Sequence, residues 1–380
     1  MLNVDVSFVI PCLNEQKTLA QAISFCKDAI KNLGTNCEIV VADNGSTDDS
    51  IQIATSLGAR VINAPHKGYG NALIHGIKKS NGKYIVMGDA DATYDFRESI
   101  KFIELIKAKS LDLVMGSRLK GNIEPNAMPF LHRYLGTPVL SWFIRRFFKL
   151  PISDCNCGMR VFTKEAFNKM NLISGGMEFA SEMLIKAGVL NLKVEEVPCS
   201  LYKDNRGRPP HLKTWRDGWR HLKFILTFAP KYIFYYPGII TMLIGLILMI
   251  MVSFGRITLF NIPFDYNFIY AGSMFLIIGY QLRWLSIFEK YYVNFVGYLT
   301  QQKLAKFEFD KYARLSGGML LVAITLILIS VINWAKHIFI ADGLNIRLLI
   351  WGINFLIISA MNFTNALMVS MMQVKIYNKE

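Results

Sequence analysis

The spacing of hydrophobic residues divides the chain into two parts. Up to about Ile225, short apolar runs alternate with charged segments, as they do in a water-soluble α/β domain. Beyond Tyr232 the apolar runs lengthen to about 20 residues, the length that a helix needs to cross the apolar core of a bilayer. We expect four such helices, at about 233–254, 268–288, 317–334 and 348–372. The pattern thus predicts a domain at 1–210, a basic juxtamembrane segment at 211–232 and a transmembrane domain at 233–380.

In the first part, we expect six short segments to form strands. They lie at Val4–Ile10, Cys37–Ala42, Arg60–Asn63, Lys83–Met87, Asp112–Met115 and Leu192–Cys199. Strands that alternate with helical segments at this spacing predict a mostly parallel, doubly wound α/β sheet. We expect Asn14 to cap the first helix, which runs to about Asn32, and Ser46 or Thr47 to start the second.

Composition and charge add a preference for membranes over nucleic acids. The 380 residues carry a net charge of +14, and no nucleic-acid recognition motif accompanies it, so we expect attraction to anionic lipid headgroups. Basic residues and tryptophans gather before the first expected membrane helix, at Arg206, Arg208, Lys213, Trp215, Arg216, Trp219 and Arg220. This segment is either a plain membrane anchor or includes a loop, 204–210, that closes over phosphate groups.

The loops between the expected membrane helices indicate their orientation. The loop at 289–316 carries Lys290, Lys303, Lys306, Lys311 and Arg314, whereas the two other loops together carry only Arg256, Lys336 and Arg347. Because basic loops stay on the cytoplasmic side, we expect the first part of the chain to be cytoplasmic. The six cysteines all lie in that part and should be reduced there. The dispersed histidines predict no zinc site.

Two aspartates follow the apolar run at 84–87. Asp89 and Asp91 stand where the expected strand ends, and in open α/β sheets ligands bind outside the carboxyl ends of the strands. Aspartate oxygens suit a Mg²⁺ or Mn²⁺ ion that also holds a diphosphate. Taken alone, the pair is equally typical of a cap for the following helix. Its position after a buried strand favours the metal.

Four sequence blocks in order carry a resemblance to a known family. The blocks Val9–Glu15, Asp43–Asp48, Gly68–Ala72 and Asp89–Asp91 resemble those of family 2 glycosyltransferases with the GT-A fold. The later blocks Gly116–Arg118 and Asp154–Arg160, with the basic segment before the membrane, are similar to polyprenyl-phosphate sugar synthases of the dolichyl-phosphate mannose or glucose synthase type. The four expected spans are similar to this branch in layout only.

The resemblance implies a set of site residues. Pro11, Asn14, Glu15, Asp43, Asn44, Gly68 and Ala90 would bind the nucleotide sugar, with Asp43 at the base edge, while Asp89 and Asp91 would hold the metal and the donor diphosphate. Arg118, Arg133, Arg160, Arg206 and Arg208 would bind the lipid phosphate, since a guanidinium matches phosphate geometry. Asp154 would act as a base or orient another group. Mannose synthases of this type often have Gln two residues after the second aspartate, but Thr93 stands here, which leaves the sugar open.

The resemblance therefore implies an inverting glycosyltransferase that moves a hexose from UDP or GDP to a polyprenyl phosphate at the cytoplasmic face of a bacterial or archaeal membrane. Contacts between membrane helices would allow a homo-oligomer. A hydroxyl lipid acceptor is the alternative, and it would make Asp154 or Glu178 essential as a base. A non-catalytic membrane scaffold with the same fold is a further alternative. The amphipathic segment Val139–Leu150 either lies among lipid headgroups or packs on the core.

Overall fold

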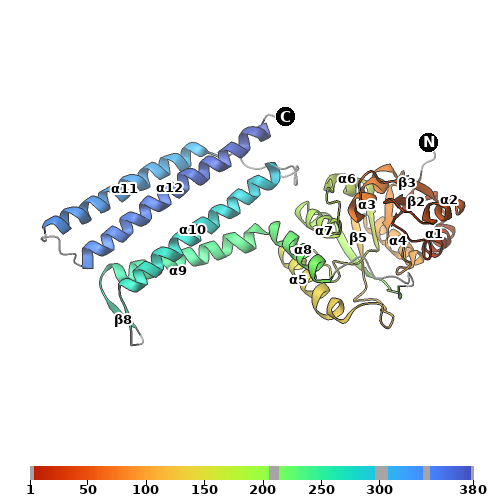
Figure 1. The fold of residues 1–380 in the computed structure, drawn as a ribbon, viewed down its shortest axis with the longest axis horizontal. Coiled ribbons are helices and arrows are strands. Elements are labelled where there is room, and N and C mark those ends of the chain that lie inside the picture. Colours follow the sequence, from red (N-terminus) through yellow and green to blue (C-terminus); the bar gives the residue numbers. More distant parts are fainter. Residues whose placement is uncertain (1–3, 205–213, 260, 296–306, 337–342, 378–380) are drawn as a thin grey trace. The chain divides into compact units, whose positions relative to one another are not determined.

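The computed structural model describes residues 4–204, 214–259, 261–295, 307–336 and 343–377. The chain forms two compact units, Met1–Phe228 and Ala229–Glu380. In Figure 1, red to green elements make up the first unit and the later green to blue helices make up the second. The described part of the segment expected as a separate juxtamembrane region, up to Phe228, belongs to the first unit.

A sheet of seven strands organises the first unit. The strands are β1 (Val6–Cys12), β2 (Cys37–Asp43), β3 (Arg60–Asn63), β4 (Tyr84–Met87), β5 (Leu113–Ser117), β6 (Arg160–Thr163) and β7 (Val194–Pro198). Their order is β3-β2-β1-β4-β6-β5-β7, and only β6 among them runs antiparallel to its neighbours. The expected mostly parallel sheet is confirmed. The sequence analysis missed β6, whose first residue, Arg160, is the last residue of the block Asp154–Arg160.

Helices cover both faces of this sheet. They are α1 (Leu19–Leu33), α2 (Ser50–Ser56), α3 (Tyr69–Lys79), η1 (Phe96–Glu98), α4 (Ser99–Lys109), η2 (His132–Gly136), α5 (Thr137–Phe148), α6 (Lys164–Met170), α7 (Phe179–Val189) and α8 (Thr214–Thr227). α1, α2 and α4 contribute to one core layer, whereas α3 packs on the opposite face against Val9 and Ala42. α8 contacts α5 and α7. Figure 1 shows these three helices grouped at one end of the unit.

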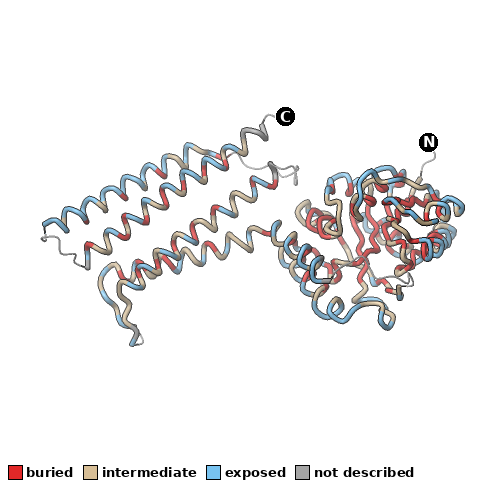
Figure 2. The backbone as a smooth tube through the Cα atoms, in the orientation of Figure 1, coloured by how far each residue is buried: buried red, intermediate tan, exposed pale blue. Residues whose placement is uncertain are grey.

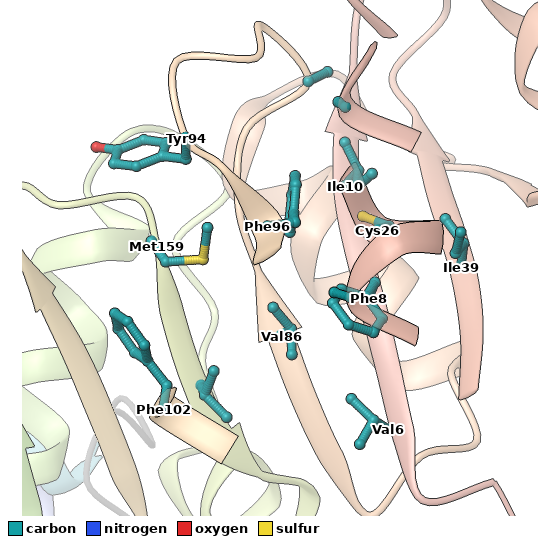
Figure 3. Packing of buried hydrophobic residues seen from close by; sticks show 14 of the residues in the cluster. Val6, Phe8, Ile10, Cys26, Ile39, Val86, Tyr94, Phe96, Phe102 and Met159 are labelled. Carbon is teal, nitrogen blue, oxygen red and sulfur yellow. The ribbon is translucent and has the colours of Figure 1, made fainter. Parts of the chain in front are cut away.

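Alternation along β1 explains the main core. Phe8 and its neighbours two residues away, Val6 and Ile10, point into the layer that contains Val86 and Phe96, as Figure 3 shows. The rings of Phe8 and Phe96 meet edge to face at 6.2 Å. A side chain on Gly88 would strike the Phe96 ring, so the chain leaves β4 through a position that only glycine fills without displacement. The core thereby fixes the start of the segment that carries Asp89.

Two expected helix starts are wrong. α1 begins at Leu19 with Thr18 as its N-cap residue, so Asn14 does not cap it. α2 begins at Ser50 with Asp49 as its N-cap residue, later than Ser46 or Thr47. In both loops the polar side chains bond across to the other loop: Thr47 N–H donates to Asn14 Oδ1 at 2.8 Å. Tertiary pairing of the two loops replaces the local capping that the sequence pattern predicts.

The second unit is a set of long apolar helices. It contains η3 (Lys231–Tyr235), α9 (Tyr236–Ser253), the hairpin β8 (Ile257–Leu259) and β9 (Ile262–Phe264), α10 (Tyr266–Phe295), α11 (Phe309–Lys336) and α12 (Gly343–Tyr377). Four stretches of the described chain are long and apolar enough to cross a membrane: Lys231–Ser253, Tyr266–Val293, Phe309–Lys336 and Leu344–Gln373. Each overlaps one of the four expected spans.

Small residues and amides hold these helices together. Side chains on Gly245 of α9 or Gly279 of α10 would strike the backbone of the facing helix, so the two helices approach at glycine. On α12, Asn354 bonds to Ser273, Asn362 to Tyr280 and Asn365 to Gln281, all of α10. In these pairs the residue numbers increase in the same order along both helices, so α10 and α12 are parallel. Figure 2 shows buried positions along facing sides of paired helices and exposed ones on the outer sides.

Candidate active site

The candidate site lies where the strand order changes direction. β1 is flanked by β2 on one side and β4 on the other, and Cys12 pairs with Asp43 while Val9 pairs with Met87. The carboxyl ends of the three strands therefore meet at one edge, next to the point at which a doubly wound sheet binds ligands. Among the predicted site residues, Pro11, Asp43 and Asp89 come from these three strand ends.

Asp89 is held from both sides. Tyr69, the first residue of α3, donates its hydroxyl to Asp89 Oδ1 at 2.9 Å. Burial, with the negative charge of Asp89, raises the pKa of Tyr69 well above its usual value, so the phenol stays protonated and remains a donor. Asp89 Oδ2 packs against Gly158, where an added Cβ would overlap that oxygen. This contact brings the predicted Asp154–Arg160 block beside the first aspartate.

Asp91 is anchored within its own loop. Its Oδ1 accepts from the Thr93 N–H at 3.0 Å and from the Thr93 hydroxyl at 2.6 Å. Thr93 therefore orients the carboxylate. The carbonyl of Thr93 in turn accepts from the Tyr202 N–H at 2.9 Å, which ties this loop to the chain that follows β7. Asp89 and Asp91 are both partly exposed.

Two side chains at the end of β2 fix the loops around it. Asp43, only 3% exposed, accepts from Gly45 N–H at 2.8 Å and from Ser46 N–H at 3.2 Å. The side-chain amide of Asn44 donates to Gly68 O at 2.7 Å and accepts from Gly68 N–H at 2.8 Å. Gly68 has φ of +132°, a backbone conformation that favours glycine, and it packs against Gly175. Asn44 thus fixes the turn that leads into α3.

The loop after β1 pairs with the loop after β2. Asn14 has φ of +57°, and its backbone N–H donates to Ser46 Oγ at 3.0 Å. The buried Glu15 donates its N–H to Ser50 Oγ at 2.9 Å. Pro11 pairs with Ala42 in the sheet, and Ala90 is buried between the two aspartates. The predicted nucleotide-binding residues are therefore brought together at one edge, and their ligand contacts stay a prediction.

Arg118 and Asp154 form a buried ion pair. The guanidinium of Arg118 grips Asp154 with two bonds, Nε to Oδ2 at 2.7 Å and Nη2 to Oδ1 at 2.8 Å. The Arg118 and Asn156 N–H groups also donate to this carboxylate, which is fully buried. Asp154 therefore already accepts four hydrogen bonds.

The sequence analysis did not identify Glu196, which bonds to the backbone of Asp154. Glu196 of β7 accepts from the Ser153 and Asp154 N–H groups at 2.7 and 2.9 Å, and it pairs with Lys120 at 2.7 Å. The strand Val194–Pro198 reads VEEVP, and nothing in the sequence separates Glu196 from its neighbour Glu195.

The remaining predicted arginines lie in different surroundings. Arg160 is fully buried and donates to the carbonyls of Cys155, Cys157 and Ala180 at 2.9–3.0 Å. Its predicted contact with the diphosphate or lipid phosphate would require the guanidinium to leave these carbonyls. Arg133 is exposed on η2, 5.5 Å from the centre of the Tyr134 ring. Arg206 and Arg208 lie outside the described residues.

The two strand-end aspartates fit a divalent cation that is shared with a substrate. Each carboxylate is anchored through Oδ1, so the pair presents hard oxygen donors at a partly exposed edge. Among the described residues, no group of three or more His, Cys, Asp or Glu side chains forms a candidate metal cage. Mg²⁺ in particular takes one or two carboxylates and completes its shell with phosphate oxygens and water.

Comparison with known proteins assigns the class. The model of glycosyl transferase family 2 matches residues 7–170, which include the strand-end aspartates and the Arg118–Asp154 pair. A relative, the low-salt glycan biosynthesis hexosyltransferase Agl6 of Haloferax volcanii, is 39% identical over 284 residues, covering 75% of this chain and 68% of Agl6. The chain belongs to glycosyl transferase family 2, and the predicted glycosyltransferase with a GT-A fold is confirmed.

Further relatives and solved structures are more distant. The glycosyltransferase AglJ of Haloferax volcanii is 28% identical, covering 56% of this chain and 68% of AglJ. Glucosyl-3-phosphoglycerate synthase from Mycobacterium tuberculosis aligns with 60% of this chain and 80% of its own, at 20% identity and a TM-score of 0.47.

Proposed function

We propose that this protein is a membrane-bound inverting glycosyltransferase that moves a hexose from UDP or GDP to a polyprenyl phosphate. Hexose transfer follows from the similarity to Agl6, which is named a hexosyltransferase of glycan biosynthesis. One observation supports a lipid acceptor most directly. The strand-end aspartates belong to the same chain as four helices that are long and apolar enough to cross a membrane. The basic loop at 289–316 supports a cytoplasmic site.

On the donor side, the chain's residues bind and orient the nucleotide sugar. Pro11, Asn14, Glu15 and Asp43 line the nucleoside, and Asp89 and Asp91 hold Mg²⁺ or Mn²⁺ at the diphosphate. The cation, when bound, stabilises the charge of the departing nucleoside diphosphate. The fixed geometry of the loops after β1 and β2 supports this arrangement, because a preorganised pocket loses little entropy on binding.

For the acceptor, exposed apolar residues of the first unit support the proposal that the enzyme acts at a lipid surface. We call aromatic face the set Phe130, Leu131, Tyr134, Leu135, Val139, Trp142, Trp215 and Trp219. Of the large apolar side chains that the described first unit exposes, all but Ile173 belong to this face. Phe130 and Leu131 precede η2, and the other residues lie in η2, α5 and α8, of which α5 contacts both of the others. The segment 129–150 contains four basic residues and no acidic one. Basic amphipathic elements of this kind bind anionic membrane surfaces.

A phosphate acceptor also suits the acids of the site. A phosphomonoester has a second pKa of about 6, so near neutral pH its oxygen is already an anionic nucleophile and needs no strong base. Asp154 is buried with four hydrogen bonds, which leaves it poorly placed to take a proton from a hydroxyl acceptor. Arg118 and Arg133, with Arg206 and Arg208, hold the acceptor phosphate. Its oxygen attacks the anomeric carbon as the bond to the donor phosphate breaks, so an α-linked donor gives a β-linked product.

The proposal is tested with radiolabelled nucleotide sugars and polyprenyl phosphate. Asp91→Ala is expected to lose about 1,000-fold or more of transfer activity while keeping its melting temperature, because the cation loses a ligand. The exposed Glu104→Ala on α4 is the control and should transfer normally. A product that mild acid cleaves supports a sugar phosphate. An acid-stable product, or full activity of Asp91→Ala, would contradict the proposal. A thermal-shift panel of UDP- and GDP-sugars identifies the donor.

A further inference from the structure

Two glutamate–lysine pairs with the same spacing lie in opposite surroundings in the first unit. Glu182 and Lys186 of α7 pair at 2.7 Å with side chains that are 0% and 2% exposed. Glu165 and Lys169 of α6 pair at 2.8 Å with side chains that are 77% and 47% exposed. An exposed pair contributes little, whereas two buried charges cost a great deal unless other bonds compensate them. The buried pair therefore calls for a specific role.

The buried pair holds a loop. Glu182 accepts from the Ile173 N–H at 3.1 Å and from the Ser174 N–H at 2.7 Å, and Lys186 donates to the Asn171 carbonyl at 2.7 Å. Both ends of the stretch 171–174 are thus fixed to α7. Glu182 lies in the first turn of α7. Its bonds reach backward to the loop before the helix.

This loop packs on the first turn of α3. The carbonyl of Gly175 accepts from the Asn71 N–H at 3.1 Å. Side chains on Gly68 or Gly70 would collide with the carbonyls of Gly175 and Ser174, so the two backbones are in direct contact. Tyr69 lies between these two glycines and donates to Asp89 Oδ1. A continuous set of contacts therefore runs from Glu182 through the loop to the first aspartate.

We propose that Glu182 is a positioning residue, which fixes the loop 173–176 against α3 and thereby keeps the Tyr69 hydroxyl on Asp89. The role rests on the proposed function, in which Asp89 binds the cation with the donor diphosphate. The hydrogen bond from Tyr69 fixes the rotamer of Asp89, and preorganised ligands bind a cation more tightly than mobile ones. Glu182 itself touches neither substrate nor metal.

The test measures Mn²⁺ binding to the full-length protein with the donor nucleotide present, by electron paramagnetic resonance. Glu182→Gln and Tyr69→Phe should each raise the Mn²⁺ dissociation constant about tenfold, the effect of one lost charge-assisted hydrogen bond. Because both act through one contact, the double variant should bind no more weakly than either single one. Glu165→Gln, the same change in the exposed pair, should bind Mn²⁺ like the unchanged protein.

Hydrogen exchange without metal separates this role from the proposed function. Glu182→Gln should speed amide exchange in Gly68–Asn71, whereas Glu165→Gln should not. Effects of Glu182→Gln and Tyr69→Phe that multiply, or unchanged exchange and Mn²⁺ affinity in Glu182→Gln, would overturn the positioning role. If the unchanged protein bound no Mn²⁺ while the exchange result held, the proposed metal site would fail and the loop contact would stand. Should Glu182→Gln not fold, Lys186→Met tests the same loop.

Discussion

The two acidic sites beside β4 and β6 differ in how their charges are satisfied. Asp89 and Asp91 are partly exposed, with a single residue between them at a strand end. Asp154 is completely buried, with Arg118 on one side and backbone N–H groups on the other. Acids of the first kind can offer carboxylate oxygens to a ligand, whereas an acid of the second kind holds the chain in place. Resemblance to a family motif does not distinguish these two uses, but burial and hydrogen-bond partners do.

The largest effect on stability is expected from breaking the buried pair. Asp154→Ala leaves the Arg118 guanidinium and two backbone N–H groups without their acceptor, which typically costs about 3–5 kcal/mol. Denaturant unfolding of the first unit should detect this loss, while Asp91→Ala, assayed in parallel, should unfold at nearly the same denaturant concentration as the unchanged protein. Equal stability of the two variants would remove the distinction between the two sites.

Disturbing the contact between Gly158 and Asp89, which joins the two sites, should weaken metal binding. A methyl group in Gly158→Ala would overlap Asp89 Oδ2, and the carboxylate would have to move. We expect the Mn²⁺ dissociation constant to rise about 10- to 100-fold, equivalent to about 1.4–2.8 kcal/mol. Calorimetry with the donor nucleotide measures it. Gly34→Ala, at a helix end where an added Cβ meets nothing within 4 Å, controls for the substitution itself, although its positive φ makes a modest loss of stability expected there.

A smaller effect is expected where the first unit meets its acceptor. Trp142→Ala on the aromatic face should raise the KM for polyprenyl phosphate in vesicles severalfold, because an aromatic anchor at the headgroups is lost. Binding of the donor nucleotide in calorimetry should stay the same. A KM that changes for the nucleotide sugar instead would place Trp142 in the donor site or the core.

The smallest effect concerns His132 on η2. Burial, together with the positive charge of Arg118, lowers the pKa of His132 below its usual value near 6.5. Below that value the unfolded chain therefore binds more protons than the folded one, so this residue makes stability fall as the pH drops through the folded pKa. The melting temperature of His132→Gln should fall less than that of the unchanged protein between about pH 7.5 and pH 5.5. A parallel fall would contradict the shift.

Periodicity was enough to predict the parallel sheet and the four long helices. The apolar run at 84–87 became β4, and its last three residues are buried, as its continuous apolar sequence predicts. The segment 60–63 became β3 at the expected bounds, although none of its four residues is buried. The predicted helix starts at Asn14 and Ser46 are wrong for a reason that no local sequence pattern reveals. Their side chains serve the opposite loop, and that pairing exists only once β1 and β2 lie side by side.

The candidate site was only partly readable from sequence. Its aspartates and glycines form a motif, so they could be found, and the collisions that a side chain would cause at Gly68 and Gly158 explain why glycine stands there. Tyr69 lies within the block Gly68–Ala72, but that block does not reveal its bond to Asp89, and Glu182 and Glu196 belong to none of the blocks. Their importance comes from contacts between segments far apart in the chain, such as Glu196 of β7 with Ser153. Their roles can therefore be recognised only in the folded structure.

The amides on α12 have a consequence for how the second unit is made. Asn354, Asn362 and Asn365 find their partners on α10, which leaves the ribosome earlier. Under the proposed function these helices cross a membrane, where an asparagine amide without a partner is unfavourable, so α12 would gain stability by joining a helix that is already there. Biogenesis of this unit would then be cooperative, with the last helix recruited by an earlier one.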